Sequence, residues 1–116
     1  MKIYVATKYE NQQRAEEVAD VLETAGHSIT YRWWSIGPKP RSAAFRARQA
    51  ELDRQGVMDA DALVLIVEQD VRYSGAIAEF GMAVARGIPV YVLGNAQDSN
   101  IFMLLPEVRR GIADLL

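Results

Sequence analysis

Carboxylates are the residues of this 116-residue chain whose types and positions best suit chemistry. The candidates are Asp53, Asp59, Asp61, Glu68, Asp70 and Glu79. Glu79 differs from the rest because the three residues on either side of it are all small or apolar. Such a carboxyl group can protonate a leaving group or attack an electrophilic carbon. The structural alternative is a half-exposed Glu in the first turn of a helix, where the helix dipole favours negative charge.

Composition and missing motifs argue against most other kinds of site. The chain has no cysteine, so thiolate catalysis, disulfides and cysteine-ligated metals are ruled out, and its single histidine, His27, cannot form a histidine metal cluster. It lacks the glycine-rich dinucleotide fingerprint, the P-loop and the nucleophile elbow of hydrolases. Its basic residues are scattered and its net charge is −2, which argues against nucleic-acid binding. We therefore expect carboxylate chemistry on a small molecule, with no metal and no cofactor.

A regular alternation of strands and helices must position these carboxylates. Apolar and β-branched runs predict strands over residues 2–6, 28–33, 62–67 and 89–94. Apolar residues at helical spacing predict helices over residues 11–25, 41–55 and 75–86, which end at Gly26, Gly56 and Gly87. The tail from residue 100 predicts one or two short helices.

The order of these elements predicts the fold class. Residues 62–67, "ALVLIV", have no polar alternation, which is typical of a parallel strand buried on both faces. Strands that alternate with helices form right-handed crossovers around a parallel sheet. We predict one domain over residues 1–116, an α/β fold. It is a small doubly wound parallel sheet, flavodoxin- or Rossmann-like. Four to five strands, in an order such as 2-1-3-4, carry helices on both faces.

Ligands of such folds bind beyond the carboxyl ends of the strands. Those ends lead into "TKYE" after the first strand, "EQDVRYSG" after the third and "NAQDSN" after the fourth. Glu79 lies about one turn into the helix that follows the third strand, which places it at the rim of this expected site.

Three sequence elements resemble the nucleoside 2-deoxyribosyltransferase family, which includes the 2'-deoxynucleoside 5'-monophosphate N-glycosidases. The chain opens with "MKIYVA", which has a tyrosine in the first strand. Asp53 precedes by eight residues the Asp61 that introduces the central apolar strand. A small-residue turn then leads into "SGAIAEFGMAVARGIPV", which contains Glu79. The resemblance spans nearly the whole chain.

The resemblance implies cleavage or transfer of the N-glycosidic bond of a (2'-deoxy)nucleoside or its 5'-monophosphate. By position, Glu79 matches the nucleophile, Asp53 the acid/base that acts on the nucleobase, and Tyr4 a residue that orients the nucleophile. The resemblance thus predicts that Glu79 and Asp53 face one pocket. Asn100 matches a residue lent to a neighbouring subunit. The other expected substrate-binding residues are Thr7, Lys8, Trp34, Ser74 and Gly75. The alternative function is a non-catalytic nucleotide-binding or sensing module on the same fold.

Several of these residues have structural alternatives. Trp33 and Trp34 could stack on a base or pack in the core, Tyr4 could be a core residue, and Asp61 could cap the third strand. Lys8 and Arg14 could bind an anion at the start of the first helix. Further cations that could hold a phosphate, or remain solvated surface charges, are Lys39, Arg41, Arg46 and Arg48.

An apolar run in the tail also predicts that the chain forms an oligomer. Residues 101–105, "IFMLL", are five consecutive apolar residues, which no single helix face can bury. We therefore predict a homodimer or dimer-based oligomer that uses this segment and possibly the Glu79 helix. The sequence has no apolar run long enough to span a bilayer and no signal-peptide pattern, so we expect no membrane partner and a cytoplasmic location.

Overall fold

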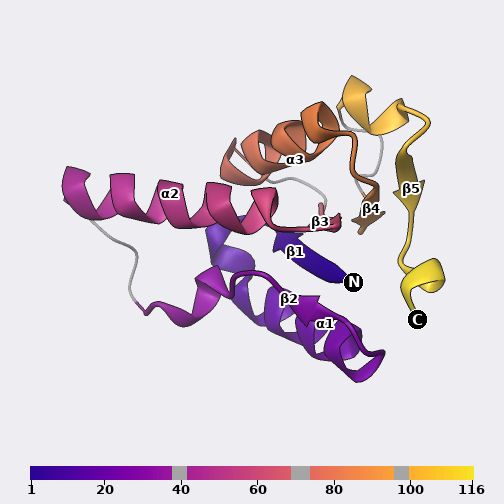
Figure 1. Cartoon of the computed structure of the whole chain (residues 1–116), viewed down its shortest axis with the longest axis horizontal. Coiled ribbons are helices and arrows are strands. Elements are labelled where there is room, and N and C mark those ends of the chain that lie inside the picture. The colour runs from indigo at the N-terminus through magenta and orange to yellow at the C-terminus, as the bar shows by residue number, and fades with distance from the viewer. Residues whose placement is uncertain (38–41, 69–73, 96–99) are drawn as a thin grey trace.

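A computed structural model describes residues 1–37, 42–68, 74–95 and 100–116. Five parallel strands form one sheet in the order β2-β1-β3-β4-β5 (Figure 1). The strands are β1 Lys2–Ala6, β2 Ser28–Ile29, β3 Ala62–Ile66, β4 Val90–Leu93 and β5 Val108–Arg110. The predicted α/β class and the order 2-1-3-4 of the first four strands are confirmed.

Helices cover both faces of the sheet. The α-helices are α1 Gln12–Thr24, α2 Ala43–Met58 and α3 Ser74–Arg86, and the short 3-10 helices are η1 Tyr9–Asn11, η2 Trp33–Ser35, η3 Ile101–Leu104 and η4 Ala113–Leu115. Helix α1 lies on one face, and α2 and α3 lie side by side on the other (Figure 1). All five residues of β3 are buried, because β3 is central in the sheet and is covered on both faces. Gly26 and Gly87 follow α1 and α3 with φ of 99° and 75°, as the left-handed residue after a helix requires.

Two predicted segments differ from the structure. The second strand is only Ser28–Ile29, at one edge of the sheet. The Thr30 amide still donates to the Ile3 carbonyl at 3.0 Å, but the chain then turns into η2, where the Trp33 indole N–H donates to the Val5 carbonyl at 2.8 Å. The tail contains a fifth strand besides its 3-10 turns, because Leu105 takes an extended backbone before Pro106 and the chain then pairs with β4.

Gly56 does not end the second helix, which continues to Met58. The glycine is buried, and a Cβ atom placed on it would lie 2.9 Å from two ring carbons of Tyr4. Gly56 therefore allows the last turns of α2 to pack directly on the side chain of Tyr4 in β1. This contact brings α2 close to the carboxyl end of the central strands, where the candidate site lies. None of the helices in the described ranges is long and apolar enough to cross a membrane.

Candidate active site

Glu79 is the sixth residue of α3 and is held by Tyr4. The Tyr4 hydroxyl donates a hydrogen bond of 2.6 Å to Glu79 Oε2. Burial raises the pKa of Glu79 to about 8, against a lowering by the Tyr4 hydrogen bond and a further raise by the Asp53 carboxyl. The expectation of a first-turn Glu is therefore wrong: Glu79 is in the second turn, half-buried, and the helix dipole does not explain its position.

Tyr4 is a core residue and a site residue at once. Its ring is fully buried between the sheet and α2, and its hydroxyl reaches the carboxyl of Glu79. Burial raises the pKa of the Tyr4 hydroxyl far above its ordinary value, and the carboxyls of Glu79 and Asp53 raise it further. Tyr4 therefore remains a protonated donor throughout the ordinary pH range.

Asp53 approaches the same place from α2. Burial raises the pKa of Asp53 to about 6, and a hydrogen bond from Gln49 opposes that raise. Gln49 Nε2 lies 3.0 Å from Asp53 Oδ1 and 3.1 Å from the hydroxyl oxygen of Tyr31. Gln49 is not among the predicted site residues, although its position one helical turn before Asp53 was a usable signal.

Both carboxyls line one cavity of about 520 Å³. The predicted convergence of Glu79 and Asp53 on one pocket is thus confirmed. The described lining residues are Thr7, Lys8, Tyr9, Glu10, Trp33, Ile36, Arg46, Gln49, Ala50, Asp53, Ser74, Gly75, Ala76 and Glu79. They come from the carboxyl end of β1, the loop after β2, α2 and the start of α3, which is the edge at which ligands of this fold class bind.

Two of the expected substrate-binding residues do not line this cavity. Trp34 is absent from the described lining; its indole N–H donates to Glu16 and its ring lies against the Arg32 guanidinium. The neighbouring Trp33 lines the cavity instead. The two rings pack edge to face with centroids 5.3 Å apart, and their N–H groups have different partners, the Val5 carbonyl for Trp33 and Glu16 for Trp34. Asn100 caps η3 by accepting a hydrogen bond of 2.9 Å from the Phe102 amide.

No protein-family model matches this sequence, and no curated protein matches it closely enough to count as a relative. Solved structures do match the fold. A 2-deoxyribosyltransferase from Bacillus psychrosaccharolyticus superimposes with a TM-score of 0.75 at 20% identity, over 89% of this chain and 80% of that one. The chain has the fold of a nucleoside 2-deoxyribosyltransferase.

Two further structures share this deoxyribosyltransferase fold. A CMP N-glycosidase, BcmB, from Clostridium botulinum matches with a TM-score of 0.63 at 18% identity, over 94% of this chain and 83% of its own. A conserved protein from Enterococcus faecalis V583 matches with a TM-score of 0.72 at 17% identity, over 99% and 92% of the two chains.

Within this deoxyribosyltransferase fold, the other predicted polar residues divide into structural and cavity groups. Asp61 accepts a hydrogen bond of 2.9 Å from the Lys2 amide and so links the start of β3 to β1. This is a structural role at the start of the third strand, as its structural alternative proposed. Asp59 accepts one of 2.8 Å from Gln55 on the exposed side of α2. The buried Thr7 lines the cavity but donates its hydroxyl proton to the Ile66 carbonyl at 3.0 Å, linking the ends of β1 and β3.

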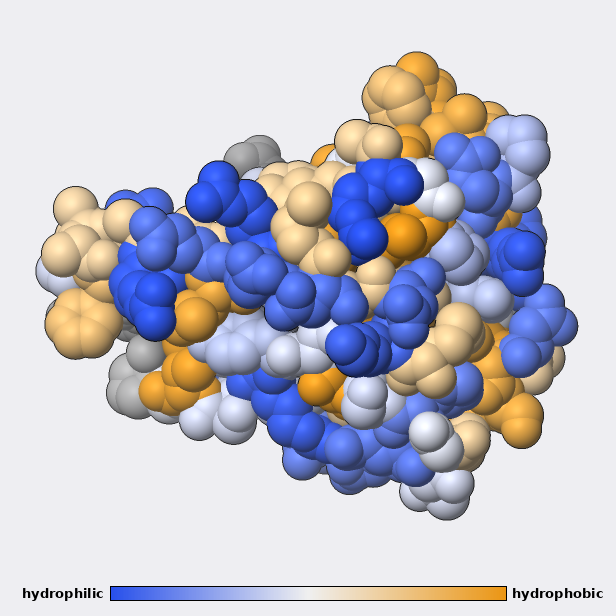
Figure 2. Space-filling model, in the orientation of Figure 1, coloured by the Kyte–Doolittle hydropathy of each residue, from blue (hydrophilic) through white to orange (hydrophobic). Residues whose placement is uncertain are grey.

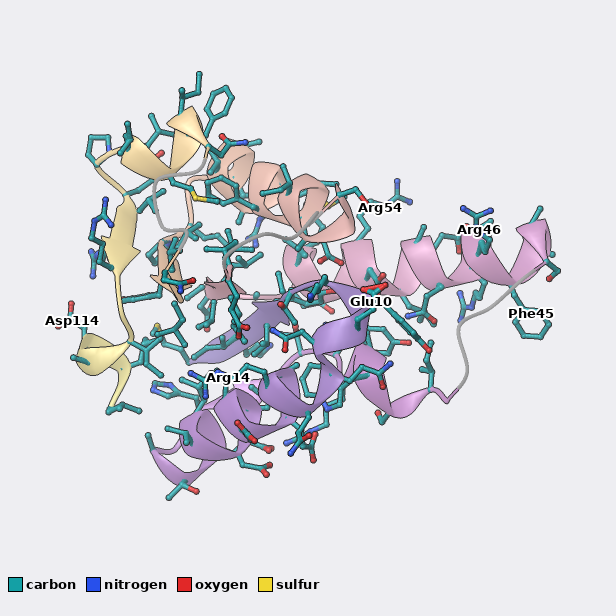
Figure 3. The ribbon with its side chains drawn as sticks, turned by 180° about the vertical axis from the view of Figure 1, so that it is seen from behind. Glu10, Arg14, Phe45, Arg46, Arg54 and Asp114 are labelled. Atoms are coloured by element: carbon teal, nitrogen blue, oxygen red, sulfur yellow. The ribbon has the colours of Figure 1, made fainter. Side chains whose placement is uncertain are left out.

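Of the predicted cations, Lys8 and Arg46 line the cavity. Figure 3 shows Arg46 beside Phe45 on the end of α2 that projects beyond the rest of the molecule. Arg14 and Arg48 instead lie 3.5 Å from Glu17 and Glu51 in exposed pairs on their own helices. Lys39, Arg41 and Asp70 lie outside the described residues. Within the described ranges, no group of three potential metal-binding side chains comes together.

Proposed function

We propose that the protein breaks the N-glycosidic bond of a (2'-deoxy)nucleoside or its 5'-monophosphate and passes the sugar to water or to another base. The observation that carries the proposal is a pair of carboxyls, Glu79 and Asp53, which line one cavity and have pKa values raised to about 8 and about 6. Groups that exchange protons near neutral pH are what acid–base and nucleophilic chemistry require. The fold shared with a deoxyribosyltransferase and an N-glycosidase supports this assignment.

In the proposed first step, the Glu79 carboxylate attacks C1' of the sugar. The C1'–N bond breaks, its electron pair goes to the base, and the Asp53 carboxyl protonates the departing nitrogen. The product is an ester between Glu79 and the sugar. In the second step a water or an acceptor base attacks C1', Asp53 takes the proton of the attacking group, and Glu79 leaves as a carboxylate. Two displacements at the same carbon retain its configuration.

Glu79 must be ionised in the reacting form while Asp53 is protonated. In the empty site the pKa values run the other way, since that of Glu79 is the higher. Two interactions favour the required form: the short hydrogen bond from Tyr4, and the positive charge that develops at C1' when the base departs. Because the two carboxyls interact, their titration belongs to the pair. Activity should therefore form a bell-shaped pH profile with its maximum between about pH 6 and pH 8.

Lys8 and Arg46 bear on the choice between a nucleoside and a nucleotide. Both line the cavity, and their positive charges would pair with a 5'-phosphate. Glu10 lines the same cavity and opposes such a charge. Both substrate forms therefore belong in the test. Activity on the monophosphate should fall as ionic strength rises, because exposed charge pairs are screened by salt.

The test is release of free base from a panel of ribo- and deoxyribonucleosides and their 5'-monophosphates, with and without a second base as acceptor. Wild-type protein should release base from at least one member, and Glu79→Gln should release none. The matched control is Glu51→Gln, which removes an exposed carboxylate from α2 and should keep full activity. Binding of a panel member without base release would favour the alternative, a non-catalytic nucleotide-binding module.

We also propose that the protein works as a homodimer. The exposed positions of α3 include Gly75, Ala78, Gly81 and Ala85, which form a small uncharged face. Beside it on η3, Ile101, Phe102 and Leu104 are 77%, 55% and 64% exposed, as the apolar run predicted. Figure 2 shows apolar side chains gathered over η3.

Patches of this kind commonly mark protein interfaces, and most oligomers close by twofold symmetry. Light scattering at micromolar concentration should give twice the 12.9 kDa of the chain. Phe102→Glu should shift the mass toward that of a monomer, whereas Phe45→Glu, at the even more exposed start of α2, should not. A wild-type protein that is monomeric and fully active would contradict this proposal.

A further inference from the structure

Gln49 occupies a position that the two-carboxyl scheme leaves without a role. It lies one turn before Asp53 on α2, lines the cavity, and donates from Nε2 to Asp53 Oδ1 at 3.0 Å. Behind it, the hydroxyl oxygen of Tyr31 lies 3.1 Å from Gln49 Nε2 and 3.3 Å from Gln49 Oε1. The phenol is thus within hydrogen-bond distance of both ends of the amide.

An amide and a phenol in this arrangement can satisfy each other in two ways. A Gln side chain donates from its nitrogen and accepts at its oxygen, and a half-turn about its last bond exchanges the two. A phenol hydroxyl can donate or accept. With Nε2 toward Asp53, Tyr31 donates to Oε1. With Oε1 toward Asp53, Tyr31 accepts from Nε2. In both orientations Gln49 keeps one hydrogen bond to Asp53 and one to Tyr31.

Asp53 needs both orientations if it acts as proposed. When it is ionised, its oxygens only accept, so it needs a donor. When it is protonated, its hydroxyl needs an acceptor or a leaving nitrogen. We propose that Gln49 is a positioning residue that holds Asp53 in both protonation states by turning its amide, with Tyr31 completing the hydrogen bonds in either state. This inference rests on the proposed function.

The proton balance follows from that scheme. In the first step the Asp53 proton goes to the departing base, and Gln49 then presents Nε2 to the new carboxylate. In the second step Asp53 receives a proton from the attacking water or acceptor base, and Oε1 can face the carboxyl again. No proton is gained or lost by Gln49 or Tyr31, so the pair ends each turnover as it began.

Neighbouring contacts hold the pair in place. The Thr30 hydroxyl donates to the Gly56 carbonyl at 2.7 Å, which fixes the loop that carries Tyr31 against α2. Among the described residues, the titratable and charged groups around Asp53 are Tyr4 on β1, Glu79 on α3, Tyr31 after β2, and Lys8, Tyr9, Glu10 and Arg46 around the cavity. Any pH profile of Gln49 variants must therefore be compared with that of Tyr4→Phe, which disturbs only the Glu79 side.

The test uses Gln49→Ala and Gln49→Glu in the full-length protein. Gln49→Ala should lower kcat about 10-fold with little change in KM, because the substrate still binds but Asp53 is no longer held. It should also move the limb of the pH profile that belongs to Asp53 to higher pH. In the wild type the hydrogen bond from Gln49 lowers the pKa of Asp53, so its loss should raise that pKa. A loss confined to KM, or no loss at all, would overturn the inference.

Gln49→Glu separates the two steps. A carboxylate at this position accepts from protonated Asp53 but cannot donate to the ionised form. The first turnover, measured as a rapid burst of free base, should stay within about threefold of wild type, while steady-state turnover should fall about 10-fold or more. Equal slowing of both phases would contradict the two-state role.

The control is Gln55→Ala. Gln55 makes the same contact one turn from Asp59, at 2.8 Å on the exposed side of the same helix, and its loss should leave both phases unchanged. Tyr31→Phe, which keeps the ring, should produce a smaller loss of about threefold and covers the case in which Gln49→Ala does not fold. An active wild type with an unaffected Gln49→Ala overturns this inference alone; a wild type that releases no base overturns the proposed function and the inference together.

Discussion

The two carboxyls of the site are held by very different parts of the molecule. Glu79 accepts a hydrogen bond directly from Tyr4, a fully buried residue in the middle of the sheet. Asp53 accepts a hydrogen bond from the side-chain amide of Gln49, and both residues are on α2. The first turns of that helix, residues 43–48, are exposed and project from the body of the molecule (Figure 1). Close-packed cores fix side chains in one arrangement, whereas half-exposed polar groups can exchange partners. We call Tyr4 and Glu79 the rigid side of the site, and Gln49 and Asp53 the adaptable side. The group proposed to form a covalent bond, Glu79, is thus on the rigid side, and the group proposed to move protons, Asp53, is on the adaptable side.

The comparison predicts unequal losses when each carboxyl is removed. Glu79→Gln should lower base release by about 10⁴-fold or more, because the neutral amide cannot form the covalent ester proposed for Glu79. Asp53→Asn should lower it by about 10²-fold, the usual contribution of a general acid. Steady-state rates on the best substrate give both numbers.

A substrate with a good leaving group sharpens this difference. A nucleoside whose base departs without protonation should restore Asp53→Asn to within a few-fold of wild type and should leave Glu79→Gln inactive. Equal rescue of the two variants would mean that the roles assigned to the two sides are wrong.

Removing the Tyr4 hydroxyl tests the rigid side alone. Tyr4→Phe keeps the buried ring and loses the 2.6 Å hydrogen bond that lowers the pKa of Glu79. The carboxylate should become harder to form, so kcat/KM at pH 7 should fall about 10-fold and the limb of the profile that belongs to Glu79 should move above about pH 8. Tyr91→Phe is the control, since its hydroxyl accepts a hydrogen bond of 3.2 Å from Arg109 and the residue is not among the described residues that line the cavity. An unchanged pH profile in Tyr4→Phe would show that this hydrogen bond does not support the carboxylate.

Gly56 is the point at which the two sides touch. In Gly56→Ala the new methyl group would lie 2.9 Å from the Tyr4 ring and 3.0 Å from Tyr31 Cβ, so packed side chains must shift. We expect a loss of about 1–3 kcal/mol in the free energy of unfolding, the usual effect of overfilling a core, together with lower activity. Gln55→Ala, at the exposed neighbouring position on the same helix, should change the free energy of unfolding little, because its side chain lies on the surface, where it donates to the exposed Asp59 at 2.8 Å. Chemical unfolding of both variants checks the difference.

The sequence predicted the rigid side better than the adaptable one. The parallel strand order follows from local periodicity, and the edge at which the site lies follows from the rule that ligands bind beyond the carboxyl ends of the strands. Asp53 is singled out from the other carboxylates only by the resemblance to the deoxyribosyltransferase family. Three features depend on contacts between residues far apart in sequence and were not predicted. Gly56 packs on the Tyr4 ring, Trp33 donates to the Val5 carbonyl, and β5 pairs with β4. A three-residue strand has too few positions for an alternation to be visible. Gln49 was different: its spacing to Asp53 could be read from the sequence, but only the structure shows that Tyr31 completes the pair.

The smallest expected effect concerns stability. The pKa of Glu79 is raised from about 4.5 to about 8 in the folded protein, so the folded state holds a proton that the unfolded chain releases. The contribution of this group to stability is therefore fully present below about pH 4.5 and is lost as the pH rises to about 8. Glu79→Gln cannot ionise and still accepts the Tyr4 hydrogen bond, so it avoids that loss.

Its melting temperature should match that of wild type at pH 4.5 and exceed it by about 4 °C or more at pH 8, which corresponds to roughly 1 kcal/mol. Asp53→Asn should show a smaller gain that is complete by about pH 6, because the pKa of Asp53 is raised less. The exposed Glu51→Gln should show no such pH dependence. If Glu79→Gln were less stable than wild type at pH 8, the carboxylate would be well solvated or well paired in the fold, and the rigid, buried side of the site would not be what holds Glu79 ready to react.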